Sequence, residues 1–113
     1  RAVVIYKEKR ISGVGFNGFP IGTKDDAELY ADRDAKLSKI VHAEVNALTF
    51  AHHTEGCTLY TWPFGCCDRC AGIVIQHGIT RVVSPKTTVE RWIKTMEKAK
   101  QYFLEAGVEV VEV

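Results

Sequence analysis

The chain has 113 residues, of which 46% are hydrophobic and 26% charged, and its formal net charge is +1. This length and composition predict one soluble globular domain over residues 1–113, built around a single hydrophobic core. No apolar run approaches the roughly 18–20 residues that a membrane-spanning helix needs. The small net charge also argues against a nucleic acid as the partner.

The chain begins with two predicted strands. Residues 2–6 and 11–16 are apolar runs separated by a short polar connection, which predicts a β-hairpin. Because both runs are continuously apolar, we expect both strands to be buried on two faces, with helices packed on the sheet. Residues 17–22 predict a turn-rich loop. The polar segment 25–33 is compatible with a short helix or with irregular structure.

The periodicity then predicts one helix from about Asp34 to His53. A single stripe of this helix contains Leu37, Val41, Glu44, Leu48 and Ala51. Glu44 is the charged member of this stripe, and burying an unpaired carboxylate is costly. Glu44 is therefore either a functional carboxylate or a residue at the edge of the stripe that reaches solvent.

Strands and helices alternate in the second half of the chain. The predicted strands are residues 57–61, 80–84 and 108–113, and the predicted helices are residues 67–78 and a helix that ends at Gly107. Thr87 and Glu90 fit a capping box at the start of the last helix. The order β-β-α-β-α-β-α-β predicts an α/β fold whose later strands run parallel.

Three of the four cysteines lie within five residues, at positions 66, 67 and 70. Cysteines this close cannot cross-link distant parts of a fold, and their neighbours suit metal binding better than disulfides. We therefore expect reduced thiols and a cytoplasmic location.

Cys67 and Cys70 are suited to hold one metal ion together with His42. Three residues apart in the first turn of a helix, the two cysteines would have Cβ atoms roughly 5–6 Å apart. The helix N-terminus favours the thiolate form that binds metal. His42 would add a third ligand, and zinc with three protein ligands keeps a fourth position for water, as catalytic sites do. Glu44 would lie near that water and move its proton to the substrate.

The combination is more specific than either motif alone, because zinc deaminases pair His-x-Glu with a later Pro-Cys-x-x-Cys. At residues 42–47 and 67–71 the chain resembles the cytidine and deoxycytidylate deaminase superfamily. Residues 15–20, Asn46 and residues 75–79 are most similar to the deoxycytidylate deaminase branch. A structural zinc site and a chance match are the alternatives to a catalytic zinc.

The resemblance implies a three-layer α/β/α sandwich with a five-stranded mixed sheet. It also implies zinc on His42, Cys67 and Cys70, with Glu44 as the proton shuttle. Asn17 is implied to contact the nucleotide and the Ala43 backbone N–H to contact the base carbonyl. The implied reaction is deamination of a cytosine nucleotide, most directly dCMP to dUMP, by a homo-oligomer of between two and six subunits.

The chain departs from the family at two places. The family has Pro immediately before the first zinc cysteine, where this chain has Cys66. Cys66 is a competing ligand, although we assign it to the loop that shapes the pocket. The helix that precedes the first strand in the family is absent from residues 1–113, and it contributes to the phosphate end of the pocket. The phosphorylation state of the substrate therefore stays open.

Several other residues admit a functional interpretation. A second zinc could be held by His52, His53 and Cys57, whereas His77 fits a packed core or interface position better. Trp62 and Phe64 could line the base pocket or belong to the core. Other functions also stay open: deamination of adenosine in tRNA, of guanine or of a riboflavin-pathway pyrimidine, or nucleotide binding without turnover. The intact Glu44 favours an enzyme, because a binding module needs no proton shuttle.

Overall fold

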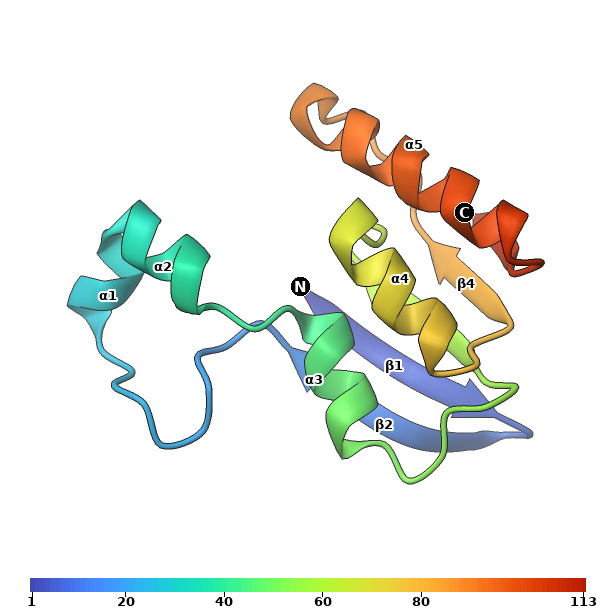
Figure 1. Ribbon diagram of the computed structural model, residues 1–113, viewed down its shortest axis with the longest axis horizontal. Coiled ribbons are helices and arrows are strands. Elements are labelled where there is room, and N and C mark those ends of the chain that lie inside the picture. The colour runs from blue at the N-terminus through green and yellow to red at the C-terminus, as the bar shows by residue number, and fades with distance from the viewer.

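The computed structural model describes residues 1–113 and contains five strands and five helices (Figure 1). In chain order these are β1 (Ala2–Lys7), β2 (Arg10–Phe16), α1 (Ala27–Ala31), α2 (Arg33–Lys39), α3 (Ala43–Phe50), β3 (Thr58–Trp62), α4 (Asp68–Gln76), β4 (Arg81–Ser84), α5 (Glu90–Glu105) and β5 (Glu109–Glu112). No helix has both the length and the apolar character needed to cross a membrane.

The strands form one mixed sheet in the order β2-β1-β3-β4-β5. β1 pairs antiparallel with β2 and with β3, whereas β3, β4 and β5 run parallel. Parallel neighbours need a crossover connection, which α4 and α5 supply here. The predicted α/β fold with a mixed five-stranded sheet and an N-terminal hairpin is confirmed.

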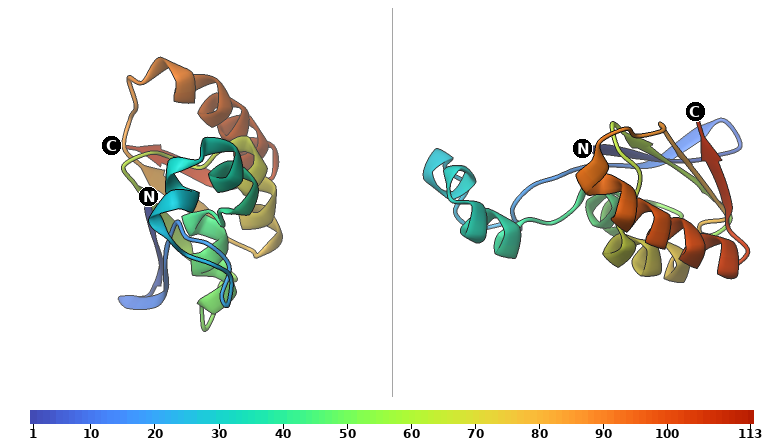
Figure 2. Two further views of the ribbon diagram at one scale, coloured as in Figure 1. Left: turned by 90° about the vertical axis from the view of Figure 1, so that its left-hand side faces the viewer. Right: turned by 90° about the horizontal axis from the view of Figure 1, so that it is seen from above.

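Helices α3, α4 and α5 lie together on one face of the sheet, and α1 and α2 project away from its side (Figure 2). Right-handed crossovers that step in one direction along a sheet place their helices on the same side, which accounts for α4 and α5. The sequence led us to expect helices on both faces. In residues 1–113 the helices that pack on the sheet form one layer on a single face, and the expected second helical layer is not formed.

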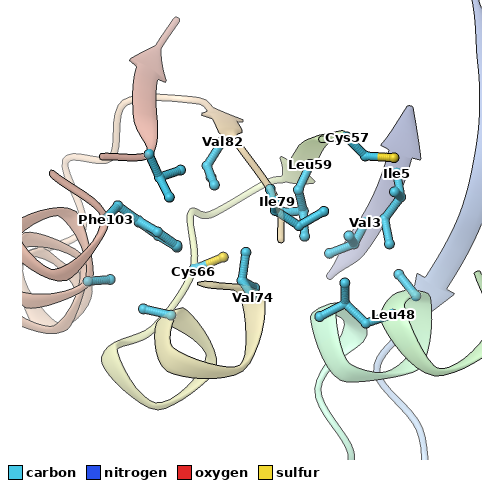
Figure 3. Packing of buried hydrophobic residues seen from close by; sticks show 14 of the residues in the cluster. Val3, Ile5, Leu48, Cys57, Leu59, Cys66, Val74, Ile79, Val82 and Phe103 are labelled. Carbon is cyan, nitrogen blue, oxygen red and sulfur yellow. The ribbon is translucent and has the colours of Figure 1, made fainter. Parts of the chain in front are cut away.

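The hydrophobic core fills the space between the sheet and this helical layer (Figure 3). Ile5 of β1 and Leu59 of β3 are fully buried there. They belong to one cluster with Leu48 of α3, Val74 of α4 and Phe103 of α5. The core therefore ties together the three helices from which the candidate site is built.

The opposite face of the sheet is apolar and open. In the observed register one apolar row crosses all five strands, in the order Val14, Val4, Tyr60, Val83 and Val111. Beside this row, Phe16 is 63% exposed and Trp62 is 67% exposed. The prediction that both hairpin strands are buried on two faces is therefore wrong. In β1 only Val3 and Ile5 are buried, and Val4 belongs to the row on the open face. Strand β2 has helix α3 on one face only.

The helix predicted from Asp34 to His53 is two helices, α2 and α3, with extended residues between them. Val41 forms an isolated antiparallel bridge with Gly18. The Gly18 nitrogen is 3.1 Å from the Val41 oxygen, and the Val41 nitrogen is 2.7 Å from the Gly18 oxygen. This pairing holds the backbone extended where the side-chain periodicity favours a helix. Residues 19–40, which we call the arm, leave and rejoin the body at this bridge, and neither α1 nor α2 has a buried residue.

The C-terminal elements agree with the sequence pattern except at one helix start. Gly107 has φ +79° and ends α5 in the left-handed region, as predicted. The predicted capping box is wrong, because Val89 is the N-cap of α5 and has no side-chain cap. The Thr87 hydroxyl instead accepts a hydrogen bond from the Val89 N–H at 3.2 Å, which forms a local turn before the helix.

Candidate functional site

The fold brings His42, Cys67 and Cys70 together from two helices. Their ligand atoms all lie within 4.8 Å of one another. His42 Nδ1 is 3.2 Å from Cys70 Sγ and 3.6 Å from Cys67 Sγ. The three predicted ligands, separated by up to 28 residues in the chain, thus form one cluster that could hold a single metal ion.

His42 reaches this cluster because it is the N-cap residue of α3. Its backbone is extended, with φ −68° and ψ 151°, and its side chain makes no capping hydrogen bond. The imidazole is therefore not engaged by its own helix and lies against the two cysteines. The bridge between Gly18 and Val41 fixes the preceding residue, so the direction from which His42 enters the helix is set by backbone pairing.

The two cysteines occupy the start of α4, where Cys67 is the N-cap and Cys70 lies within the first turn. A helix from the other end of the sheet secures this turn. The Thr95 hydroxyl of α5 donates to Asp68 Oδ1 at 2.7 Å, and the Asp68 N–H donates to the same hydroxyl at 3.0 Å. The hydrogen bond from Thr95 lowers the pKa of Asp68. Helix α5 thereby holds the segment that carries both sulfurs.

The three side chains share protons in a way that suits metal binding. A hydrogen bond from the Cys70 side chain, and another with His42, lower the pKa of Cys67. The same hydrogen bond to Cys67 raises the pKa of Cys70, and burial adds to this effect. Hydrogen bonding with Cys67 raises the pKa of His42. These hydrogen bonds favour the thiolate form of Cys67, and a dication would compete with the shared protons for the same electron pairs.

Glu44 is fully buried next to this cluster. Its negative charge contributes to the raised pKa values of His42 and Cys70. One carboxylate oxygen, Oε2, is 3.1 Å from Arg1 Nη1, whereas the other, Oε1, is buried without a hydrogen-bond partner. The alternative in which Glu44 reaches solvent at the edge of its stripe is therefore wrong.

Asn17 and Ala43, the two predicted substrate contacts, are bonded to each other. The Ala43 N–H donates to Asn17 Oδ1 at 2.8 Å. The side chain of Asn46 donates to the Phe16 carbonyl at 2.7 Å and so fastens α3 to the end of β2. The resemblance assigns the Ala43 N–H to a base carbonyl, but in this structure it donates to the amide oxygen of Asn17. Ala43 directly follows His42, so this hydrogen bond also brings Asn17 to the border of the cluster.

Cys66 is not part of the cluster of ligand atoms. It is 3% exposed and belongs to the hydrophobic core. Burial raises the pKa of its thiol well above the usual range, and the nearby Glu44 charge raises it further. The ligand atoms that lie within 4.8 Å of one another belong to His42, Cys67 and Cys70, and Cys66 is not among them.

The other candidate residues lie apart from the cluster. The Cys57 thiol contacts the His53 carbonyl at 3.6 Å, and His52, His53 and Cys57 do not bring three ligand atoms together. His77 is exposed at the end of α4, with Nδ1 2.8 Å from the Ile73 carbonyl oxygen, and is not a core residue. Trp62 lies on the open face of the sheet, and Phe64 packs against Trp92 with ring centroids 5.7 Å apart.

The residue that the sequence analysis missed is Arg1. Its side chain is 10% exposed and pairs with the buried carboxylate of Glu44. The signal that could have found it is the two-residue period of β1, because Arg1 has the same parity as the buried Val3 and Ile5.

The donor set matches zinc. One imidazole nitrogen and two sulfurs are the ligands that zinc takes in protein sites with an open fourth position. The buried, unpartnered Oε1 of Glu44 fits the same interpretation, because a bound group at this place would supply the missing polar partner. The side chains present in the chain therefore fit a zinc ion with three protein ligands.

Comparisons with known proteins agree with this site. Residues 2–85 match the family described as the cytidine and deoxycytidylate deaminase zinc-binding region. The chain is 41% identical over 111 residues to an uncharacterized deaminase in the luxG 3′ region of Aliivibrio fischeri, covering 95% of this chain and 74% of that protein.

Human deoxycytidylate deaminase is 35% identical over 89 residues, which cover 73% of this chain and 49% of the human protein. The chain thus spans about half the length of this relative. The crystal structure of a dCMP deaminase from the cyanophage S-TIM5 in apo form has the same fold, with a TM-score of 0.74 at 21% identity, over 99% of this chain and 79% of that one. With the match to the family over residues 2–85, these similarities establish that the chain belongs to the cytidine and deoxycytidylate deaminase family and carries its zinc-binding region.

Proposed function

We propose that this chain catalyses the zinc-dependent hydrolytic deamination of a cytosine nucleotide, most directly dCMP, with water consumed and dUMP and ammonia released. The observation that carries this proposal is the fully buried Glu44 beside a cluster of three, not four, metal-binding side chains. A structural zinc site uses four protein ligands and needs no adjacent carboxylate. The relatives named deoxycytidylate deaminase support dCMP as the first substrate to test.

In this proposal His42, Cys67 and Cys70 hold the zinc. Zinc in such a site lowers the pKa of a water molecule and so supplies a nucleophile at neutral pH. The protein contributes the shape and the electrostatics of the zinc site. The first N–H groups of both helices are already hydrogen-bonded, Ala43 N–H to Asn17 Oδ1 and Asp68 N–H to Thr95 Oγ1. The position of Cys67 and Cys70 at the N-terminus of α4 nevertheless favours their thiolate form, because the helix dipole is positive there.

Glu44 is the residue to which we assign proton transfer. Replacing an amino group by a carbonyl oxygen requires a proton to leave the attacking water and protons to reach the ring nitrogen and the departing amine. A buried carboxylate with one unpartnered oxygen, Oε1, can accept and return such a proton without competition from solvent. Asp68, the other carboxylate near the cysteines, is bonded to Thr95 and is not free for this role.

We assign recognition of the nucleotide to Asn17 and the Ala43 N–H. The two groups are 2.8 Å apart, at the point where the loop after β2 meets the start of α3. A nucleotide that bonds to the Asn17 amide and to the Ala43 N–H would exchange this internal hydrogen bond for two bonds of its own. Substrate binding would then fix the loop and the helix end at the same time.

The wider description of the protein follows from the same observations. We propose that it acts on a small nucleotide, since its net charge of +1 offers no basic surface for a nucleic acid. We also propose a homo-oligomer, because the apolar row across the open face of the sheet is a surface that isolated domains rarely expose. Reduced cysteines, all four of which are free, fit a cytoplasmic location.

The proposal is tested by measuring ammonia release from dCMP, dCTP, cytidine, cytosine, guanine and adenosine in parallel, with zinc content determined on the same samples. We expect turnover of a cytosine nucleotide. Glu44→Ala and Glu44→Gln should lower kcat by about 10²–10⁴-fold or more while zinc content stays unchanged. Activity on guanine or adenosine alone would favour one of the other deaminases, and a wild-type protein that binds nucleotides without turnover would favour the non-catalytic module.

A further inference from the structure

The salt bridge between Arg1 and Glu44 differs from the other ion pairs of the molecule. Its partners are 10% and 0% exposed and 3.1 Å apart. The pairs Arg81–Glu109 and Lys100–Glu112 are between 35% and 65% exposed on every side chain. Exposed pairs contribute little to stability because solvent screens them. A buried pair is kept in one geometry by its surroundings, and loss of one partner leaves an uncompensated charge.

Arg1 treats the two oxygens of Glu44 unequally. Its Nη1 is 3.1 Å from Oε2, whereas Oε1 is buried without a hydrogen-bond partner. The backbone of Arg1 is itself tied to the site, because its carbonyl accepts a hydrogen bond from the Asn17 N–H at 3.4 Å. One oxygen of the carboxylate is therefore held by the guanidinium, and the other is not held by a hydrogen bond.

The charge of the site supports the same role. Two thiolates and one carboxylate around a dication would sum to one negative charge, and the Arg1 guanidinium makes the buried set neutral. Among the salt bridges of the structure, Arg1 is the sole partner of Glu44.

We propose that Arg1 is a positioning residue for Glu44: by holding Oε2, its guanidinium keeps Oε1 as the oxygen that accepts and returns the proton during deamination. This inference rests on the proposed function. Arg1 would act through Glu44 and not on the substrate. Its loss should therefore lower kcat and leave KM nearly unchanged, because substrate recognition lies with other groups.

The test compares Arg1→Met, which keeps most of the side-chain volume, with Arg1→Lys, which keeps the charge but not the planar fork. Arg81→Met is the matched control, since it removes an arginine from an exposed ion pair. Each full-length variant is assayed for kcat, KM and zinc content. We expect Arg1→Met to lower kcat by about 10–100-fold with full zinc content, Arg1→Lys to lie between it and the wild type, and Arg81→Met to match the wild type. Millimolar methylguanidinium should restore part of the activity of Arg1→Met.

A second measurement needs no activity. Thermal unfolding of the metal-free proteins forms a double-mutant cycle of Arg1→Met with Glu44→Gln. Arg1→Met alone leaves a buried, unpaired carboxylate and should lower Tm, and adding Glu44→Gln should recover part of the loss.

The outcomes separate this inference from the proposed function. If Arg1→Met has the kcat of the wild type, or if the cycle shows no coupling, the positioning role is wrong while the deaminase activity stands. A loss of kcat that follows lost zinc, or that neither lysine nor methylguanidinium relieves, would show a structural role and would also overturn it. A wild-type protein without any deaminase activity would overturn the proposed function and this inference together.

Discussion

Helices α2 and α3 lie on either side of His42, and they are held in opposite ways. Four of the eight residues of α3 are buried, and none of the seven residues of α2 is. Leu48 in α3 is 4% exposed, whereas Leu37 in α2 is 60% exposed. The two leucines belong to one stripe of the helix that the sequence predicts. Their different surroundings show that His42 lies at the boundary between a buried helix and an exposed one.

The anchoring of α3 comes from the strand below it. Gly13 and Gly15 of β2 allow the helix backbone to approach so closely that a Cβ atom on Gly15 would be 2.3 Å from the Ala47 nitrogen. The arm is joined to the body at the bridge between Gly18 and Val41. Glu44 thus lies on a helix whose position is set by close backbone contact with β2, whereas the helices of the arm have no buried residue.

The largest effect on stability should come from a substitution that fills the close contact between β2 and the backbone of α3. Gly15→Ala places a methyl group against the backbone of Ala43 and Ala47, which cannot move aside as a side chain could. We expect it to lower the free energy of unfolding by more than about 4 kcal/mol or to prevent folding. Chemical denaturation measures this. Gly18→Ala at the base of the arm, where a Cβ meets nothing within 4 Å, is the control and should be nearly neutral. Equal losses in both variants would contradict the comparison.

The leucine pair gives the next effect. Leu48→Ala should lower the free energy of unfolding by about 3 kcal/mol, because it leaves a cavity in the core. Leu37→Ala removes the same atoms from an exposed position, so we expect a change below about 0.5 kcal/mol. Denaturation midpoints of the two variants against the wild type provide the measurement. A loss of more than half the Leu48→Ala value at Leu37 would mean that α2 is buried against something in solution, such as a second subunit.

The sequence was informative where one side-chain pattern corresponds to one structure. The hairpin, the parallel second half and the cluster of His42, Cys67 and Cys70 follow from apolar runs and from ligand spacing. Glu44 was also identified correctly as a polar residue on an apolar stripe, and it is buried. The roles of these residues in catalysis stay predictions until they are tested.

The failures share a physical cause, which is that backbone pairing and tertiary contact override local periodicity. The bridge between Gly18 and Val41 interrupts a helix that the side chains alone favour. Val89 occupies the N-cap position of α5 without a side-chain cap, because the Thr87 hydroxyl accepts the Val89 N–H in a turn before the helix. The continuously apolar strands predicted a sheet that is covered on both faces. The strands themselves do not encode what covers the second face.

Removal of zinc should destabilise the starts of α3 and α4, which carry the predicted ligands, and should leave α2 unchanged. At free zinc of about 100 Kd, chelation should cost about 2.7 kcal/mol of stability, the free energy of binding to the folded state. The amides of Asn46 and Ala71 bond to the carbonyls of His42 and Cys67, at 3.1 Å each, and should lose protection in hydrogen exchange. The Lys36 amide in α2 serves as the internal control and should be unaffected. Equal deprotection of α2 would show that the two helices are coupled through the histidine.

The smallest effect should come from the cap of the exposed helix. Asp32 Oδ1 accepts hydrogen bonds from the N–H groups of Asp34 and Ala35, at 3.1 and 3.2 Å. Asp32→Ala removes both, which should unfold α2 locally and raise the exchange rate of the Ile40 amide. Because α2 contributes no buried residue, we expect global unfolding to change by less than about 0.5 kcal/mol. Asp32→Asn keeps the acceptor oxygen and should behave as the wild type does. If Asp32→Ala instead lowered the global stability, α2 would have to be part of the cooperative unit that contains α3, and its exposure would not mean independence.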